Sequence, residues 1–406
     1  MTGSGPAKTR LAYQEFGELT AGQRRWIDFL DHEFHSLWGL GRNLILVWTP
    51  LERAMQVLVI PHYTIGEHAE RAREELEIYG PSALGIKPTS FVEDVIANPK
   101  HVTLDGMRHL ARLMEYDPVE IALPFAPGRD LGYPLIEEVI KRYSISYVED
   151  RAVALFDIVG FSLQSPLQQV TQLNSLAYSV NSAYSKMLEK NIDISFTRST
   201  TGDGFYIWNR DRSIQANVNL YHFMHLVLAD NAIANSKSKA NTTPELRACF
   251  HIGGHYEFYQ SEGLSPTIYS YIVGDVTIEL ARMIDCAGAG QVLVGDFEVP
   301  ILNRETGLTH KIDTVEFIEY TQRSLSSLEG IVLSGDQVDD IRCYLTGERR
   351  DADFAIKRYL IADKHGRTRN VYNAKINIYR ANAEPIFLGA QTSDLKDFKC
   401  ISEAFV

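Results

Sequence analysis

The chain has 406 residues, and its 40 Lys and Arg against 52 Asp and Glu give a formal net charge of −12. No cluster of basic residues offsets this acidity, so the sequence excludes a protein that wraps nucleic acid with a positive surface. A hydrophobic content of 45% and a charged content of 23% are typical of globular proteins and exclude a disordered chain. A polyanionic ligand must therefore meet a few placed cations, metal ions or backbone N–H groups.

The four cysteines indicate a reducing compartment. They are far apart and form no C-x-x-C pair: Cys249, Cys286, Cys343 and Cys400. No apolar run approaches the ~18 residues that a bilayer span needs, and no apolar segment of a signal peptide follows Met1. We therefore expect a cytoplasmic protein with neither a membrane nor a nucleic-acid partner.

Residues 1–145 carry helical signals but no motif with chemistry. Apolar residues at helical spacing predict helices over residues 20–38 and 102–114, and residues 68–78 form a charged amphipathic segment. Residues 44–60 hold two short apolar runs, and the Pro- and Gly-rich residues 124–134 are typical of a connector. We expect an accessory or dimer-supporting region.

From about residue 147 short apolar runs alternate with amphipathic segments. Ser165 and Pro166 predict the start of a helix. Further helices are expected over residues 213–235 and from Gly274, and strands over residues 152–156, 192–196, 205–208, 246–251 and 291–295. This order predicts an α+β fold in which helices cover a sheet.

Two carboxylates stand where predicted strands give way to turns. Asp157 follows the run Ala154–Phe156, and Asp203 lies in the turn Thr201–Gly204. If both point into one cleft, two carboxylates and a backbone carbonyl suit one or two hard divalent ions. Alone, each aspartate is more typical of a turn or a helix cap.

Two further features suit a phosphate ligand. Gly160, Phe161 and Ser162 lie between Asp157 and the predicted helix, where backbone N–H groups at a helix start bind phosphate. Arg282, in the third predicted helix, carries a permanent charge that stabilises a reacting phosphate. Both features also occur in proteins without such a ligand.

Five segments, in order, resemble class III nucleotide cyclases. They are Phe156–Ser162 (F-D-I-V-G-F-S), Thr201–Gly204 (T-G-D-G), Arg247–Gly253 (R-A-C-F-H-I-G), Gly274–Met283 and Gly290–Val294 (G-Q-V-L-V). The resemblance implies a ferredoxin-like cyclase domain that acts as a homodimer with shared active sites. It also implies that Asp157, the Ile158 carbonyl and Asp203 hold two Mg²⁺ or Mn²⁺ ions. Arg282 of the partner subunit is then expected to stabilise the pentavalent phosphorus while the ribose 3′-oxygen attacks the α-phosphate and pyrophosphate leaves.

The chain departs from the purine-specific members of this family at three positions. Ser199 stands where they place a base-reading Lys or Glu, Tyr271 aligns with their second base-contacting residue, and Ile278 replaces an Asn. Cys249 also replaces a glycine. The resemblance therefore does not support purine recognition in its usual form.

Residues Arg198–Gly204 (R-S-T-T-G-D-G) instead resemble bacterial pyrimidine cyclases of the Pycsar anti-phage defence system, and residues 300–406 resemble an adenylate/guanylate-cyclase sensor (AGS-C) domain through Ala362–Gly366 and Tyr372–Ile378. We expect Arg198, Ser199 and Thr200 to contact the base. Because Arg198 has only donors and uracil presents an O4 acceptor, we predict UTP as the substrate and cyclic UMP as the product.

Three alternatives stay open: a cyclase that uses CTP, a purine cyclase with a rearranged pocket, and a non-catalytic nucleotide sensor. The expected domains are residues 1–145, 146–299 and 300–406. The resemblance also implies a downstream effector that binds the cyclic nucleotide.

Overall fold

The computed structural model describes residues 19–37, 44–65, 95–192, 194–261, 268–302, 307, 309–350, 353–363, 366–395 and 398–405. The chain divides into unit 1, residues 1–148 and 256–272, and unit 2, residues 149–255 and 273–406. The amphipathic segment predicted over residues 68–78 lies outside the described residues. Among the described helices, none combines the length and apolar character that crossing a bilayer requires.

Unit 1 contains a three-stranded antiparallel sheet in the order β1-β2-β3. Its elements are α1 (Ala21–Leu37), β1 (Leu44–Pro50), β2 (Ala54–Ile60), α4 (Leu104–Met114), β3 (Val119–Ala122), α5 (Tyr133–Ile140) and a 3-10 turn (Lys141–Tyr143). The helix predicted over residues 20–38 is α1, the one over residues 102–114 is α4, and the two apolar runs are β1 and β2.

The side chains of β1 divide between the two cores of unit 1. Ile45 and Trp48 pack with Leu30 of α1 and Ile136 of α5. Leu46 packs instead with Leu58, Ile60 and Met107 of α4. The sheet of unit 1 therefore has a helix layer on each face. Ile45 and Trp48 are three residues apart and still share a core, because a register shift in β1 lies between Ile45 and Val47.

The first half of unit 2 is a βαββαβ arrangement. Its elements are β4 (Ile145–Ile158), a 3-10 turn (Phe161–Leu163), α6 (Pro166–Glu189), β5 (Phe196–Thr200), β6 (Gly204–Asn209), α7 (Ile214–Lys237), β7 (Leu246–Ser261), α8 (Asp275–Cys286) and β9 (Val292–Gly295). β8 (Ile268–Val273) belongs to unit 1 up to Ile272. The strand order β9-β7-β4-β6-β5 contains the 4-1-3-2 order of a ferredoxin-like fold. This confirms the α+β, ferredoxin-like prediction. The strand predicted over residues 192–196 is wrong, because strand pairing begins only at Phe196, opposite Asn209.

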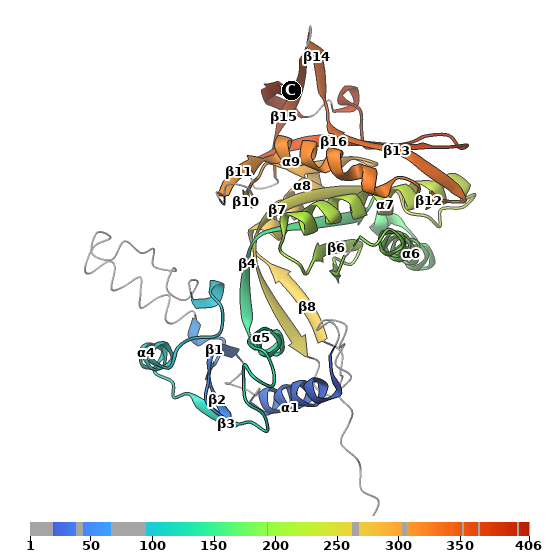
Figure 1. Cartoon of the computed structure of the whole chain (residues 1–406). Coiled ribbons are helices and arrows are strands. Elements are labelled where there is room, and N and C mark those ends of the chain that lie inside the picture. The colour runs from blue at the N-terminus through green and yellow to red at the C-terminus, as the bar shows by residue number, and fades with distance from the viewer. Residues whose placement is uncertain are drawn as a thin grey trace, which may run out of the picture. The chain divides into compact units, whose positions relative to one another are not determined.

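One face of this sheet packs against α6 and α7 (Figure 1). Phe156 of β4, Ile207 of β6 and Phe250 of β7 belong to the same core as Val180 of α6 and Tyr221 of α7. Asp157, the next residue after Phe156, therefore points to the opposite face. On that face, Tyr206 Oη donates to the Thr277 carbonyl oxygen of α8 at 3.3 Å.

The second half of unit 2 extends the same sheet. Its elements are β10 (Glu298–Leu302), β11 (Thr309–Asp313), α9 (Thr314–Ser324), a 3-10 turn (Leu325–Leu328), β12 (Val332–Leu333), β13 (Asp336–Leu345), β14 (Gly347–Arg350), β15 (Asp353–Ala362), β16 (Thr368–Arg380), β17 (Ile386–Leu388), a 3-10 turn (Thr392–Asp394) and β18 (Lys399–Phe405). β16 pairs antiparallel with β9 over Val371–Ala374, so the sheet continues without a break past residue 299.

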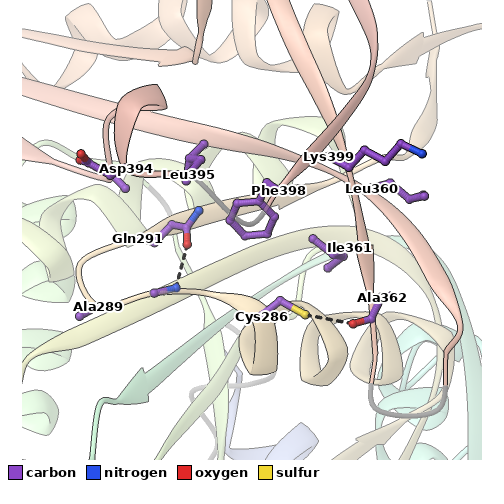
Figure 2. Close-up of a pocket in the computed structure, with 12 residues that line it drawn as sticks. Cys286, Ala289, Gln291, Leu360, Ile361, Ala362, Asp394, Leu395, Phe398 and Lys399 are labelled. Atoms are coloured by element: carbon purple, nitrogen blue, oxygen red, sulfur yellow. Dashed lines mark hydrogen bonds between the residues drawn. The ribbon is translucent and has the colours of Figure 1, made fainter.

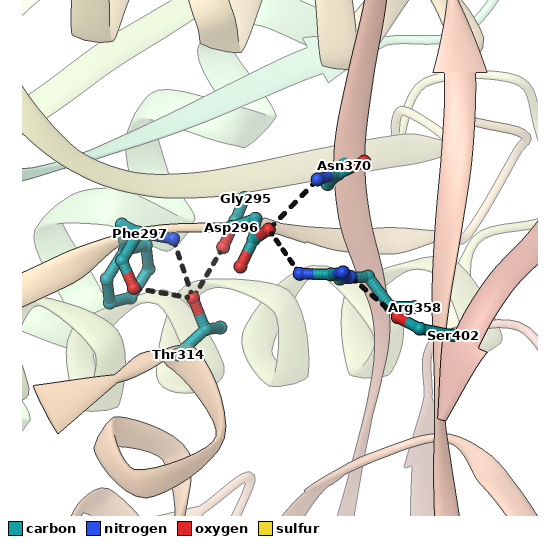
Figure 3. A network of polar contacts seen from close by, with 7 residues as sticks. All are labelled: Gly295, Asp296, Phe297, Thr314, Arg358, Asn370 and Ser402. Atoms are coloured by element: carbon teal, nitrogen blue, oxygen red, sulfur yellow. Dashed lines mark hydrogen bonds and ion pairs between the residues drawn. The ribbon is translucent and has the colours of Figure 1, made fainter. Parts of the chain in front are cut away.

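Polar contacts at the end of β9 reinforce this junction (Figure 3). Asp296 Oδ2 accepts hydrogen bonds from Arg358 Nη1 at 3.1 Å and from Asn370 Nδ2 at 3.2 Å. Arg358 Nε in turn donates to Ser402 Oγ at 2.8 Å, and Thr314 Oγ1, at the start of α9, donates to the Gly295 carbonyl oxygen at 3.0 Å. Leu360 lies in β15, and residues 371–378 lie in β16. The division at residues 145 and 299 stays a prediction.

Candidate functional site

The fold brings the two predicted metal-binding aspartates together. Asp157 is near the end of β4, and its Cα is paired with Gly204, the residue after Asp203. The Ile158 amide donates to the Asp203 carbonyl oxygen at 3.0 Å, which fixes the β5–β6 turn against the end of β4. Thr201 Oγ1 donates to Asp203 Oδ1 at 3.2 Å and orients that carboxylate.

Gly204 permits this close approach of two strands. A Cβ atom at position 204 would lie 1.9 Å from the Phe156 carbonyl oxygen, which is impossible without moving the backbone. Gly202 adopts φ +101°, a left-handed conformation that closes the turn at little cost only for glycine. The backbone geometry therefore requires glycine at both glycine positions of the turn T-G-D-G.

Arg247 of β7 forms an ion pair with Asp157 that the sequence reasoning did not assign. Its Nε donates to Asp157 Oδ2 at 2.7 Å, and its Nη1 donates to the Ala287 carbonyl oxygen at 3.1 Å. Burial raises the pKa of Asp157, Arg247 lowers it in part, and the nearby Asp203 carboxylate raises it further. The arginine was visible only as the first letter of the R-A-C-F-H-I-G segment, and nothing in the sequence paired it with Asp157.

This donor set fits a hard divalent ion. Two carboxylates lie close enough for Asp203 to raise the pKa of Asp157, and a cation relieves such repulsion. Asp157 Oδ1, which Arg247 does not take, the Asp203 carboxylate and the Ile158 carbonyl are all oxygen ligands of the type that Mg²⁺ and Mn²⁺ accept. Among the described residues no group of three or more His, Cys, Asp or Glu gathers, so substrate and water oxygens must complete the coordination.

The predicted phosphate turn directly follows β4. Gly160 adopts φ +66°, and residues Phe161–Leu163 form a 3-10 turn whose first N–H groups have no partner within the turn itself. Gln169 of α6 donates from Nε2 to the Phe161 carbonyl oxygen at 3.1 Å and so braces the turn. Ser165 caps α6 through a capping box with Gln168, as Ser165 and Pro166 predict.

The register of β5 separates the three predicted base-contacting residues. Ser199 lies opposite Tyr206, which lies opposite Leu155, so Ser199 is on the same face as Asp157. Arg198 lies opposite Ile207 on the other face, where its guanidinium sits 5.4 Å from the centre of the Phe205 ring. Thr200 also lies on that other face, and its Oγ1 accepts from the Gly202 amide. The structure thus brings only Ser199 to the aspartate face.

Tyr206 is a second residue of this face that the sequence reasoning missed. It is half-buried between Ser199 and Leu155, and burial raises its pKa to about 12. It therefore stays a neutral donor at physiological pH. Strand alternation from Asp157 would have found it, once β4 and β6 were known to be neighbours.

The remaining predicted residues make the following contacts in the structure. In its own chain Arg282 Nε lies 3.4 Å from Asp363 Oδ2, at the end of β15. Ile278 of α8 is 47% exposed. Tyr271 belongs to unit 1, where its ring stacks on Phe258 with a centroid distance of 5.4 Å. The predicted roles of Arg282 and Tyr271 stay predictions.

Several solved structures are similar to this chain. The guanylate cyclase domain of RhGC from Catenaria anguillulae, solved in complex with GTP, is 13% identical with a TM-score of 0.32, covering 58% of this chain and 100% of that one. The adenylyl cyclase CyaB from P. aeruginosa is 13% identical with a TM-score of 0.32, covering 59% and 97%. A bacterial light-regulated adenylyl cyclase is 12% identical with a TM-score of 0.28, covering 45% and 99%.

No family model and no curated protein matches the chain. The ferredoxin-like fold therefore rests on the strand order of the chain's own sheet.

Proposed function

We propose that this chain is a metal-dependent nucleotide cyclase. The observation that carries the proposal is the pair of carboxylates, Asp157 and Asp203, held together by the Ile158–Asp203 backbone hydrogen bond at the end of a ferredoxin-like sheet. The ribose 3′-oxygen of a nucleoside triphosphate attacks the α-phosphorus. The bond to the bridging oxygen breaks, pyrophosphate leaves, and the 3′-hydroxyl proton goes to solvent.

The residues of the site have distinct roles in this proposal. Asp157, Asp203 and the Ile158 carbonyl hold Mg²⁺ or Mn²⁺, which when bound lowers the pKa of the 3′-hydroxyl and neutralises triphosphate charge. Backbone N–H groups of Gly160, Phe161 and Ser162 bind phosphate oxygens. Arg247 keeps the Asp157 carboxylate in one orientation through its 2.7 Å contact.

The proposed enzyme is a homodimer in which Arg282 acts on the partner's substrate. An exposed apolar row supports a contact with a partner: Leu163 at the end of the phosphate turn, and Leu167, Val170 and Tyr178 on α6, with 86%, 75%, 65% and 74% exposure. The last three share one face of α6 by helical spacing. A mixture of the Asp157→Asn and Arg282→Ala proteins should regain activity that neither protein has alone. Failure of this complementation would remove Arg282 from a shared site.

The proposed substrate is UTP, with CTP as the alternative. Its support is the segment Arg198–Gly204 and the absence of a Lys or Glu at Ser199, whose short side chain lies on the aspartate face. Position 199 therefore lacks the long Lys or Glu side chain with which purine cyclases contact the base. The product, cyclic UMP, is proposed as a messenger in anti-phage defence that an effector protein reads, with residues 300–406 as a sensor region.

The test is to incubate the purified full chain with Mn²⁺ and each of the four nucleoside triphosphates separately, and to identify products by mass spectrometry. We expect cyclic UMP and pyrophosphate. Asp157→Asn and Asp203→Asn should abolish both, whereas Asp340→Asn, at an exposed pair with Arg342, should not. Cyclic AMP or cyclic GMP as the main product would reject the pyrimidine proposal. Binding of UTP without pyrophosphate release would reject catalysis and favour the sensor alternative.

A further inference from the structure

A cavity of about 640 Å³ lies in unit 2, between the end of α8 and the C-terminal strands (Figure 2). Its walls come from two parts of the chain that are far apart in sequence: residues 286, 288, 289 and 291 before and at the start of β9, and residues 360–362, 390, 394, 395, 398 and 399 from β15 to β18. A volume of this size is typical of small-molecule sites. The metal-binding aspartates do not line it.

The interior of the cavity is mainly apolar, with one flat ring. Leu360, Ile361 and Leu395 line it together with Phe398, whose ring lies in the middle of the lining residues in Figure 2. The charged ends of Asp394 and Lys399 point away from that ring. The Asp394 carboxylate also forms a hydrogen bond within its own turn, because its Oδ2 accepts from the Gln391 amide at 3.1 Å. The cavity thus suits an uncharged molecule better than a phosphate or a carboxylate.

Gln291 supplies the polar edge of the cavity. Its Oε1 accepts from the Gly288 amide at 2.8 Å, and its Nε2 donates to Asn373 Oδ1 at 3.1 Å. A primary amide has two N–H donors and two acceptor lone pairs, so one donor and one acceptor remain after these bonds. Asn373 is itself held by Thr346 and the Ala390 carbonyl, so the buried amide of Gln291 is fixed in position.

We propose that this cavity binds a nucleoside or free nucleobase. A base has the flat ring that stacks on Phe398 and an amide-like edge with adjacent donor and acceptor atoms, which matches what Gln291 leaves unused. Of the described lining residues, none points a cation toward the Phe398 ring, so we expect no preference for the phosphorylated forms. This ligand site is separate from the triphosphate site of the proposed cyclase.

The cavity-lining residue Ala362 is followed directly by Asp363, which forms an ion pair with Arg282. Ala362 lines the cavity, and its carbonyl oxygen lies 3.7 Å from Cys286 Sγ. The next residue, Asp363, is buried and lies 3.4 Å from Arg282 and 3.3 Å from Arg369. Because Arg282 and Cys286 are four residues apart on α8, they contact this corner together. A ligand that moves Ala362 therefore changes how firmly Asp363 holds Arg282. This regulatory step rests on the proposed function, whereas binding does not.

Binding is measured by titration calorimetry on the full chain, with uridine, cytidine, adenosine, guanosine and uridine 5′-monophosphate as probes. We expect at least one nucleoside to bind more tightly than the monophosphate. Phe398→Leu removes the ring and Ala289→Trp fills the mouth, and each should weaken binding at least tenfold. Ala240→Trp, in an exposed loop, should leave it unchanged. Circular dichroism of each variant establishes that it is folded.

Two controls distinguish this site from the triphosphate site. Asp157→Asn should retain nucleoside binding, and the bound nucleoside should change the rate of pyrophosphate release in the wild-type protein but not in Asp363→Asn. No binding by any nucleoside, equal binding by folded Phe398→Leu and Ala289→Trp proteins, or tighter binding of the monophosphate would overturn the proposal. A protein that binds nucleosides but makes no cyclic nucleotide would leave the cavity assignment standing and reject the cyclase.

Discussion

The Nε atom of Arg247 lies 2.7 Å from Oδ2 of Asp157, so one oxygen of the buried carboxylate is committed to the guanidinium. The Nη1 atom of the same arginine is anchored to the Ala287 carbonyl oxygen, at the end of α8. The arginine therefore sets the angle at which Asp157 presents its other oxygen. It also connects the end of β4, where we propose that metal binds, to the end of the helix that carries Arg282.

The first prediction concerns this connection. Arg247→Lys keeps the positive charge but loses the fork that bridges Asp157 and Ala287, because a lysine has a single nitrogen. We expect the Mn²⁺ concentration for half-maximal activity to rise about 10- to 100-fold, the usual cost of losing a residue that orients a metal ligand. Arg342→Lys, at an exposed ion pair with Asp340, is the matched control and should change nothing. An unchanged metal requirement in Arg247→Lys would refute the orienting role.

The second prediction is a pH-dependent stabilisation by metal. Without metal, the raised pKa of Asp157 means that the folded protein binds this proton more tightly than the unfolded chain does. The contribution of Asp157 to stability is therefore present below the unfolded pKa and is lost as pH rises through the folded pKa. Mn²⁺ binds the ionised carboxylate, so its effect has the opposite sign and grows with pH.

Thermal melting with and without Mn²⁺ at pH 5 and pH 8 measures both effects. At Mn²⁺ equal to one hundred times the dissociation constant we expect about 2.7 kcal/mol of stabilisation, with a larger rise in melting temperature at pH 8. Asp157→Asn should remove the rise at both pH values. A rise of the same size in that variant would place the metal elsewhere.

The third prediction concerns the backbone contact beneath the aspartates. Gly204→Ala forces a Cβ atom against the Phe156 carbonyl oxygen, so β4 and β6 must separate where Asp157 and Asp203 meet. We expect a loss of about 3 kcal/mol in the free energy of unfolding, measured by urea denaturation. In Gly288→Ala the nearest atom to the new Cβ is 3.6 Å away, and that variant should unfold like the wild type. Equal stability of the two variants would show that the close approach is not required.

The fourth prediction assigns base selection within β5. Because Ser199 shares the face of Asp157 and Arg198 does not, Ser199→Ala should change the ratio of cyclic UMP to cyclic CMP by at least about tenfold, the scale of a lost polar contact to the substrate. Arg198→Met should change it less than twofold, while reducing stability through the lost contact with Phe205. The reverse result would restore Arg198 as the base-reading residue.

Local patterns in the sequence were sufficient for the elements around the site. Ser165 and Pro166 marked the start of α6, the turn T-G-D-G placed the β5–β6 hairpin, and the alternation of helix and strand predicted the α+β fold. These signals are local, because caps and turns depend on a few neighbouring residues. They therefore located Asp157 and Asp203 at strand ends before any pairing was known.

The unpredicted parts of the site depend on pairing between distant segments. The contact of Arg247 with Asp157 joins residues 90 positions apart, and that of Arg282 with Asp363 requires β15 to lie beside α8. The face on which Arg198 lies depends on the register between β5 and β6, and a shift of one residue would reverse it. A motif of consecutive letters does not contain this register. Such relations become visible only when the sheet is assembled.

The pairing of β9 with β16 has a consequence for how this protein can change over evolutionary time. β9 lies inside the sheet, with β7 on one side and β16 on the other. Because β9 and β16 cover each other's edge, neither edge has been selected to pair with a different segment. Exchange of the region after residue 299 between relatives would have to preserve the ladder from Val371 to Ala374 and the Asp296 contacts with Arg358 and Asn370. The two halves of unit 2 are therefore expected to be inherited together, and substitutions along this ladder are expected to occur in compensating pairs.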